Sequence, residues 1–405
     1  MLDDFGQRIR DIILSEMDLS RELSDEEICD LIGSVVSREA RDRPMTIKDR
    51  AELERTIFNS LRKLDVLQEL VDDRDVTEIM VNGPNDIFYE KAGRIQRFKG
   101  HFSSEEKLED VIQQIVGRHN RVVNQASPIV DTRLSDGSRV NIVLNPISIG
   151  GSAVSIRKFP EHPMSMERLV EIEALSPDVA RLLQILTQAK YNIFISGGTG
   201  SGKTTFLNAL SQYIPDDERI ITIEDSAELQ LLGAKNLVRL ETRNANTDGV
   251  TPITIRDLIR TALRMRPDRI IVGECRGAEA LDMLQAMNTG HDGSLSTGHA
   301  NSPHDIISRI ETMVLQGQDF PLNAIRQQIA SGIDIIVQLG RLRDKSRRVL
   351  EVSEVDGFID GEIVLHTLYR FEETGVLDSG RIQGFLKKAG TLCHTDKLLA
   401  AGLSV

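Results

Sequence analysis

The sequence predicts an α/β protein whose carboxyl-terminal half is a mostly parallel sheet flanked by helices. Its 405 residues correspond to roughly two to three domains, with a core of ordinary size. Hydrophobic residues make up 40% and charged residues 27% of the chain, which is a globular composition rather than that of a disordered or collagen-like one. From residue 176 onward, helical patterns alternate with short β-rich runs, as expected where helices connect parallel strands.

The first 70 residues are expected to form a small helical bundle. Apolar residues recur at helical spacing within 2–17, 24–36 and 46–70, so each stretch predicts an amphipathic helix. Ser24 followed three residues later by Glu27 is a capping-box pattern, which marks the start of the second helix.

Residues 71–158 are expected to form an α+β domain. Runs with strand patterning alternate with turn residues, and one helical stretch begins at residue 103 or 104. The predicted strands are 77–81, 86–90, 94–98, 132–134, 139–144 and 153–157. A linker follows over 159–176, where Pro160 and Pro163 interrupt any regular pattern, and 177–405 form the last domain. In that domain the predicted strands are 192–196, 220–223, 237–240, 270–272, 294–297 and 333–338.

The strongest motif is GGTGSGKT at residues 197–204. It matches the G-x-x-x-x-G-K-[ST] phosphate-binding loop (P-loop) and lies between a predicted strand and a predicted helix, as that motif requires. Its glycines allow backbone N–H groups to surround phosphates, Lys203 can reach the outer phosphates, and the hydroxyl of Thr204 can bind Mg²⁺. The predicted nucleotide-binding residues are Gly197, Gly198, Thr199, Gly200, Ser201, Gly202, Lys203, Thr204 and Thr205.

A carboxylate that can orient the attacking water follows the apolar strand 270–272. Glu274 stands where a P-loop ATPase places its catalytic acid, at the carboxyl end of a strand beside the P-loop. The Asp that usually precedes this Glu is replaced by Gly273. The alternative is that Glu274 only caps the next helix.

Without that Asp, Mg²⁺ must depend on Thr204, on water and on carboxylates elsewhere. Glu224 and Asp225 stand at the end of the predicted strand 220–223, and we predict a catalytic role for Glu224 and a metal contact for Asp225. The alternative is that both carboxylates cap the turn 226–229.

Two histidines, His291 and His299, lie in the glycine-rich segment 288–301. They could be metal ligands together with His304, but no Cys or carboxylate stands at ligand spacing. A structural role for both is a second alternative. We favour a position of one or both near the γ-phosphate, where the histidine couples the presence of that phosphate to movement.

These segments resemble bacterial secretion ATPases of the type II/type IV superfamily, most closely the CpaF-type ATPases of tight-adherence (Tad) pili. The resemblance covers roughly residues 65 to 400. Its motifs are the P-loop, ITIED at 221–225, ALRMRPDRIIVGE at 262–274, the histidine segment 288–301, VTEIMVNGP at 76–84, and residues 127–141.

The resemblance implies a homohexamer that hydrolyses ATP with Mg²⁺. ATP would bind between an α+β (PAS-like) domain and a carboxyl-terminal RecA-like P-loop ATPase domain. Lys203 would bind phosphate, Glu274 would be the general base, and His291 or His299 would sense phosphate. Its partners would be inner-membrane pilus platform proteins, reached from the cytoplasmic face of the membrane.

The resemblance also implies arginines that act on the nucleotide of a neighbouring subunit. Arg133 and Arg157 match best, with Arg139 behind them; the alternative for each is a surface salt bridge. A second basic set, between the ITIED segment and Glu274, could line a subunit interface or a pore, or simply form a solvated helix face. Its members are Arg239, Arg243, Arg256 and Arg260.

Charge and apolar patterning narrow the classes of function. The net charge of −13 and the 4% aromatic content weigh against a nucleic-acid partner. No apolar run approaches the ~18–20 residues of a membrane span, and the acidic start lacks a signal-peptide pattern, so we expect a cytoplasmic protein. Cys29, Cys275 and Cys393 are too scattered for a disulfide framework. A type IV secretion ATPase, a nucleic-acid translocase and a slowly hydrolysing, ATP-gated scaffold remain alternatives.

Overall fold

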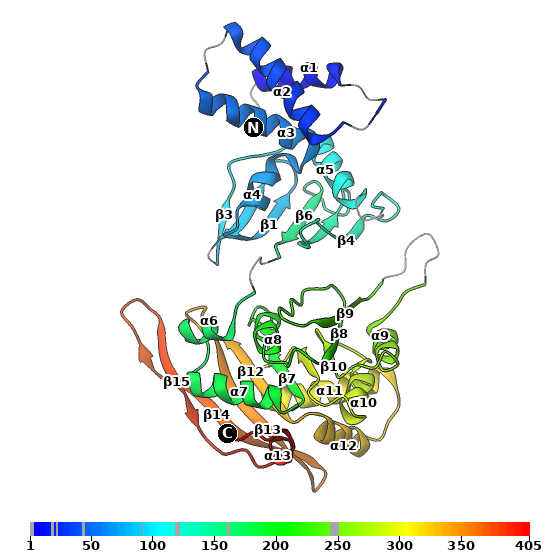
Figure 1. Cartoon of the computed structure of the whole chain (residues 1–405), viewed down its shortest axis with the longest axis vertical. Helices are drawn as coiled ribbons and strands as arrows, with labels where there is room; N and C mark the ends of the chain where they lie inside the picture. Colours follow the sequence, from blue (N-terminus) through cyan, green and yellow to red (C-terminus); the bar gives the residue numbers. More distant parts are fainter. Residues whose placement is uncertain are drawn as a thin grey trace. The chain divides into compact units, whose positions relative to one another are not determined.

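The computed structural model describes residues 4–17, 20–21, 23–42, 45–91, 93–117, 122–159, 163–243 and 251–405. The chain folds as two compact units, Met1–Glu161 and His162–Val405 (Figure 1). The expected start of the first helix at residue 2 and Pro160 of the expected linker lie outside the described residues.

The first unit begins with a helical bundle that has its own apolar core. Ser24 and Glu27 form the predicted capping box: the Ser24 hydroxyl accepts from the Glu27 N–H, and the Glu27 carboxylate accepts from the Ser24 N–H. The predicted third helix is too long, because Lys63 is extended and Asp65 is left-handed, with φ 52°. The helical elements of this part are α1 (Asp4–Glu16), α2 (Asp25–Glu39), η1 (Ala40–Asp42), α3 (Ile47–Arg62), η2 (Asp65–Leu67) and α4 (Gln68–Asp72).

A six-stranded antiparallel sheet with one long helix follows, in the order β3-β2-β1-β6-β5-β4. Alternate residues of β5 and β6, such as Val140, Ile142 and Ile156, are buried in one apolar cluster with Leu108 and Ile112 of α5. This period of two is what makes the strands readable from sequence. The elements are β1 (Val76–Asn82), β2 (Ile87–Lys91), β3 (Arg94–Arg97), α5 (Glu105–Gly117), β4 (Ile129–Arg133), β5 (Arg139–Val143) and β6 (Ala153–Arg157).

The second unit is built on a nine-stranded sheet, in the order β15-β14-β13-β12-β7-β11-β10-β8-β9. The strands from β12 to β9 in that order pair in parallel, as predicted, whereas β13, β14 and β15 form an antiparallel meander that the sequence analysis did not anticipate. The strands are β7 (Ile193–Gly197), β8 (Arg219–Glu224), β9 (Asn236–Glu241), β10 (Arg269–Val272), β11 (Leu295–Gly298), β12 (Ile335–Arg341), β13 (Arg347–Ile359), β14 (Glu362–Val376) and β15 (Ile382–Lys388).

Helices cover both faces of this sheet, which gives the α/β architecture that the sequence predicts. Ile193 and Ile195 pack into one cluster with α7 and α8, while Phe194 between them packs into a second cluster with α10, α11 and α12. The helices are α6 (Met166–Glu171), α7 (Pro177–Gln188), α8 (Lys203–Ser211), α9 (Ile255–Ala262), α10 (Ala280–Asn288), α11 (Pro303–Gly317), α12 (Leu322–Gly332) and α13 (Asp396–Ala401).

The predicted linker 159–176 contains a helix of the second unit. Met166 and Leu169 of α6 lie three residues apart on one helix face and are buried in the core beside α7. Among the described residues, no helix combines the length and the apolar character that crossing a membrane requires.

Candidate nucleotide site

The predicted catalytic segments meet at one edge of the second sheet. Strands β7, β11, β10 and β8 are neighbours, run parallel and end nearly in register. The P-loop follows β7, His299 follows β11, Glu274 follows β10, and Glu224 ends β8. In open α/β sheets, ligands bind at this carboxyl edge.

The P-loop makes a tight turn from β7 into α8. Gly202, the residue before the helix, has φ +94°, a left-handed conformation that favours glycine, and Lys203 is the first helical residue. The Lys203 ammonium donates to the carbonyls of Gly197 at 3.0 Å and Gly198 at 3.1 Å. Partial burial lowers the pKa of Lys203. The first-turn N–H groups of α8 and this cation together make an anion-binding site.

His299 lies between Lys203 and Glu274. Its Nδ1 is 3.2 Å from the Lys203 ammonium, and its Nε2 is 2.7 Å from a carboxylate oxygen of Glu274. An ammonium can only donate, so Nδ1 accepts and the proton of the neutral ring is on Nε2, facing Glu274. Partial burial lowers the pKa of His299, which agrees with a neutral ring.

The second oxygen of Glu274 is bound by Arg276, a residue that the sequence analysis missed. The guanidinium donates to Glu274 at 2.6 Å, and this hydrogen bond raises the pKa of Arg276. Cys275, between Glu274 and Arg276, is fully buried. In extended chain, residues two apart point to the same side, so Arg276 could have been expected on the side of Glu274. Glu279, not Glu274, accepts from the N–H groups of Arg276 and Gly277 before α10, which argues against the capping alternative.

Glu224 occupies the space that a side chain at position 273 would need. A Cβ added to Gly273 would lie 2.9 Å from Cγ of Glu224, closer than carbon atoms pack. One Glu224 oxygen accepts from the N–H groups of Glu228 and Leu229, at 2.7 and 2.8 Å, which is the turn-capping alternative. The other oxygen is buried and finds no hydrogen-bond partner in the described part of the chain. Burial raises the pKa of Glu224 to about 7, despite the two N–H donors.

The donor set fits a Mg²⁺ ion that is bound together with phosphates. No group of three or more His, Cys, Asp or Glu side chains that could hold a metal occurs within the described residues, the histidines included. Mg²⁺ typically keeps several waters and binds through one or two protein oxygens plus substrate phosphates. The half-exposed Thr204, the exposed Asp225 and the unpartnered oxygen of Glu224 are oxygen donors of this kind. Asp225 also lies 3.7 Å from Arg276.

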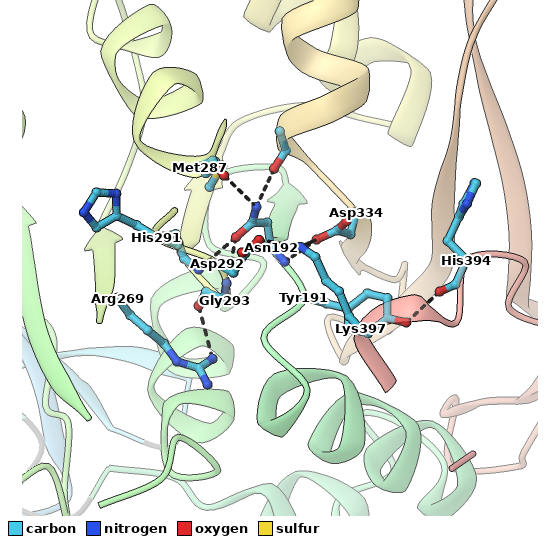
Figure 2. Close-up of polar contacts among 12 residues, drawn as sticks. Tyr191, Asn192, Arg269, Met287, His291, Asp292, Gly293, Asp334, His394 and Lys397 are labelled. Atoms are coloured by element: carbon cyan, nitrogen blue, oxygen red, sulfur yellow. Dashed lines mark hydrogen bonds and ion pairs between the residues drawn. The ribbon is translucent and has the colours of Figure 1, made fainter. Parts of the chain in front are cut away.

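His291 lies before β11, at the edge of the sheet opposite the P-loop, so within this unit the structure does not bring it beside Lys203. The loop that follows it is held by Asn192, whose side-chain oxygen accepts from the N–H groups of Gly293 and Ser294 at 2.9 and 3.0 Å (Figure 2). Arg269 donates to the Gly293 carbonyl at 3.2 Å. This half of the histidine segment therefore has a structural role, and His299 is the histidine beside Lys203.

The three predicted arginines belong to the first unit and form a row across its sheet. Arg133 pairs with Arg139 across β4 and β5, and Arg139 pairs with Arg157 across β5 and β6. Directly opposed residues share a face of the sheet, and opposed like charges are destabilising. Arg139 lies 3.8 Å from Asp131, and Arg157 is exposed. Such a row is suited to an anionic ligand.

Three members of the second basic set contact other residues of the second unit. Arg256 and Arg260 of α9 both lie within 3 Å of the buried carboxylate of Asp282 on α10. Arg243 donates to the carbonyl of Thr251 at 3.1 Å. Arg256 and Arg260 therefore join two helices of the second unit.

A P-loop lysine after β7, a carboxylate after β10, with β11 between these two strands, and a RecA-like sheet define an ATP hydrolase. A family described as "Type II/IV secretion system protein" matches residues 60–379, and the chain belongs to it. The chain is 33% identical over 322 residues to a putative conjugal transfer protein of Mycobacterium tuberculosis, covering 77% of this chain and 91% of that protein. It is also 33% identical over 320 residues to the type IV secretion system protein PtlH of Bordetella pertussis, covering 73% and 94%.

Solved structures share the fold. The pilus retraction motor PilT with bound ADP superposes with a TM-score of 0.55 at 22% identity, over 82% of this chain and 84% of that one. The ATPase DotB of Legionella pneumophila gives 0.52 at 22% identity, over 73% and 80%. The expected secretion-ATPase superfamily is confirmed. The relatives named above are conjugal transfer and type IV secretion proteins, so they do not single out Tad pili.

Proposed function

We propose that this protein is a hexameric motor ATPase that drives a type IV-like pilus or secretion machine from the cytoplasmic face of the inner membrane. The observation that carries the proposal is the continuous set of contacts from Lys203 through His299 to Glu274 and Arg276. It connects the phosphate-binding lysine to the carboxylate that faces the attacking water, so phosphate binding and hydrolysis are coupled.

The residues divide the work of hydrolysis. The N–H groups of the P-loop and the Lys203 ammonium bind the phosphates, and the Glu274 carboxylate orients the water and takes its proton. Thr204 and either Glu224 or Asp225 would hold Mg²⁺ together with the phosphates, and the bound ion would neutralise negative charge on the transferred phosphoryl group. Arg276 holds the Glu274 carboxylate in position through its hydrogen bond.

His299 acts as the phosphate sensor. Lys203 now donates to Gly197, Gly198 and His299, and a bound phosphate competes for the same ammonium protons. When Lys203 turns to phosphate, Nδ1 of His299 loses its donor, and the ring is free to move together with Glu274. The occupancy of the P-loop is thereby transmitted to β11.

Arginines of the first unit complete the site of a neighbouring subunit. The row of Arg133, Arg139 and Arg157 presents guanidinium groups on one sheet face, where they can stabilise charge on the phosphoryl group. In other NTPases such an arginine contributes roughly 10³–10⁵ in rate. Because it is supplied in trans, hydrolysis requires the ring.

Two machines remain as candidates. Tad-type pilus assembly follows from the sequence resemblance, with platform proteins of the inner membrane as partners and no nucleic acid. The conjugal transfer protein and PtlH favour a type IV secretion role. Each is 33% identical to this chain, and the alignments span 91% and 94% of their lengths. Restoring pili or substrate transfer in a strain that lacks the gene separates the two.

The first test is steady-state ATPase activity of the purified protein with and without single- and double-stranded DNA. Lys203→Ala is the blank, because it removes the phosphate-binding cation. We expect turnover that is indifferent to DNA and that rises steeply with protein concentration as rings assemble. Strong stimulation by DNA at physiological salt would refute the secretion motor and favour a translocase.

A further inference from the structure

A polar cavity of about 80 Å³ lies where the helical bundle meets the sheet of the first unit. It is lined by α1, α3, the η2–α4 segment and α5, so residues far apart in the chain face one space. The volume accommodates several water molecules, or one tetrahedral oxyanion in their place. The P-loop, in the other unit, takes no part in it.

Two arginines in the cavity wall make no direct polar contact. Arg10 of α1 and Arg55 of α3 make no hydrogen bond or ion pair within the described part of the chain, and Nε of Arg10 is buried. The charge of Arg10 still acts on Asp65, where it partly opposes the effect of burial on the pKa of that carboxyl. A buried donor without an acceptor is costly, and the cost is larger when the donor is charged. The buried Nε of Arg10 therefore points to a ligand, and Arg55 adds a second guanidinium group to the same wall.

A third cation comes from α5. The Lys107 ammonium donates to the carbonyl of Ser60 at 3.0 Å and lies 3.8 Å from the carboxylate of Asp65. Glu69, the other carboxylate of the cavity wall, is exposed. Burial lowers the pKa of Lys107 and raises that of Asp65, so both charges are costly in this environment. Three cations against two carboxylates leave the cavity positive.

Helical spacing brings further polar groups to the same space. Gln7 lies three residues before Arg10 on α1, and Asn59 lies four residues after Arg55 on α3, so each pair shares one helix face. Donors therefore converge from three helices, as binding a multivalent oxyanion requires.

We propose that this cavity binds the phosphate group of a small phosphorylated ligand and that the bound phosphate holds α1 and α3 against the sheet. Guanidinium groups match phosphate oxygens in geometry, and the hydrogen bonds are charge-assisted. The cavity is large enough for the phosphate but not for a nucleoside, so the remainder of a larger ligand lies outside, on the side of the exposed Arg55.

Amide hydrogen exchange of the full-length protein tests this, with inorganic phosphate added against chloride at equal ionic strength. We expect phosphate to slow exchange in α1 and α3. Arg10→Gln and Arg55→Gln should each raise the half-saturating phosphate concentration by about tenfold or more, because each removes a charge-assisted hydrogen bond. Arg8→Gln is the matched control: Arg8 is also on α1, but it is exposed and pairs with Glu39.

The P-loop also binds phosphate, so the two sites must be separated. Peptides from 197–211 report the P-loop, and Lys203→Ala should leave the protection of α1 and α3 intact. Protection confined to 197–211, or protection of α1 and α3 that survives both arginine substitutions, would overturn the proposal. If Arg10→Gln fails to fold, Arg55→Gln alone decides, because Arg55 is exposed.

A second probe, glycerol 3-phosphate, distinguishes the sources of the phosphate. Half-saturation at a lower concentration than with inorganic phosphate identifies a phosphomonoester ligand. Equal concentrations identify inorganic phosphate itself. Both results support the site, whereas no response to either probe contradicts it.

Discussion

The buried carboxylate of Glu224 makes the stability of the second unit depend on pH. Its side chain is 3% exposed, and burial raises its pKa from 4.5 to about 7. Because the folded pKa lies above the unfolded value, the folded state binds more protons between these two values. The contribution of Glu224 is therefore complete below pH 4.5 and is lost as the pH rises through 7.

The size of the effect follows from the two pKa values. Raising the pKa from 4.5 to about 7, at about 1.36 kcal/mol per unit, changes the free energy of unfolding by roughly 3 kcal/mol between low and high pH. About 2.5 kcal/mol of this change falls between pH 5 and pH 8.5. Glu224→Gln cannot ionise and keeps an oxygen that can accept from Glu228 and Leu229. We therefore expect the variant to gain about 2.5 kcal/mol relative to the wild type over this pH range.

Urea unfolding followed by circular dichroism, at pH 5, 7 and 8.5, measures this difference. Comparing two proteins at each pH cancels the titration of the other groups. Glu171→Gln is the control, since that carboxylate is 62% exposed in the same unit, and its profile should parallel the wild type. A Glu224→Gln profile that also parallels the wild type would refute the assignment of a raised pKa to Glu224.

Three further predictions concern catalysis. Glu274→Gln should lower turnover about 10²–10⁴-fold while ATP still binds, because the general base is removed and the P-loop is intact; turnover and equilibrium nucleotide binding measure this. Gly273→Ala should destabilise the protein by about 1–3 kcal/mol and lower turnover, because its Cβ would lie 2.9 Å from Glu224; the urea midpoint and turnover report both. His299→Ala should lower turnover, whereas His291→Ala should leave it near the wild type, since His291 lies at the other edge of the sheet.

Each of these predictions has a contradicting outcome. Wild-type turnover in Glu274→Gln would show that another group activates the water. Gly198→Ala is the control for position 273, because a Cβ there meets no atom within 4 Å, and equal destabilisation by both substitutions would argue against a clash with Glu224. A larger loss in His291→Ala than in His299→Ala would reverse the assignment of the phosphate sensor.

Local patterns in the sequence were sufficient for the P-loop and the strands around it. The motif 197–204, with an apolar run before it and a helical pattern after it, required no knowledge of distant residues, and the structure has β7, the loop and α8 there. Short apolar runs likewise placed β8, β10 and β11 to within a residue or two. Periodicity records which side chains are buried, and burial is a local property of a strand or helix.

Contacts across the sheet were not readable in this way. The position of Glu224 against Gly273 depends on β8 lying beside β10, and the distinction between His299 and His291 depends on the direction of β11. Arg276 gave only a weak local signal.

The meander β13–β15 and the cavity of the first unit were not predicted, because both depend on contacts between distant residues. The meander β13–β15 carries partly exposed strands with mixed burial, so its periodicity is weak. The cavity of the first unit joins α1, α3 and α5, whose cationic residues each look like ordinary surface positions in the sequence. Local sequence patterns are enough to predict most elements and the residue types that can bind phosphate. Which of these side chains share one space depends on the folded chain, because strand order and helix packing bring together residues that are far apart in the sequence.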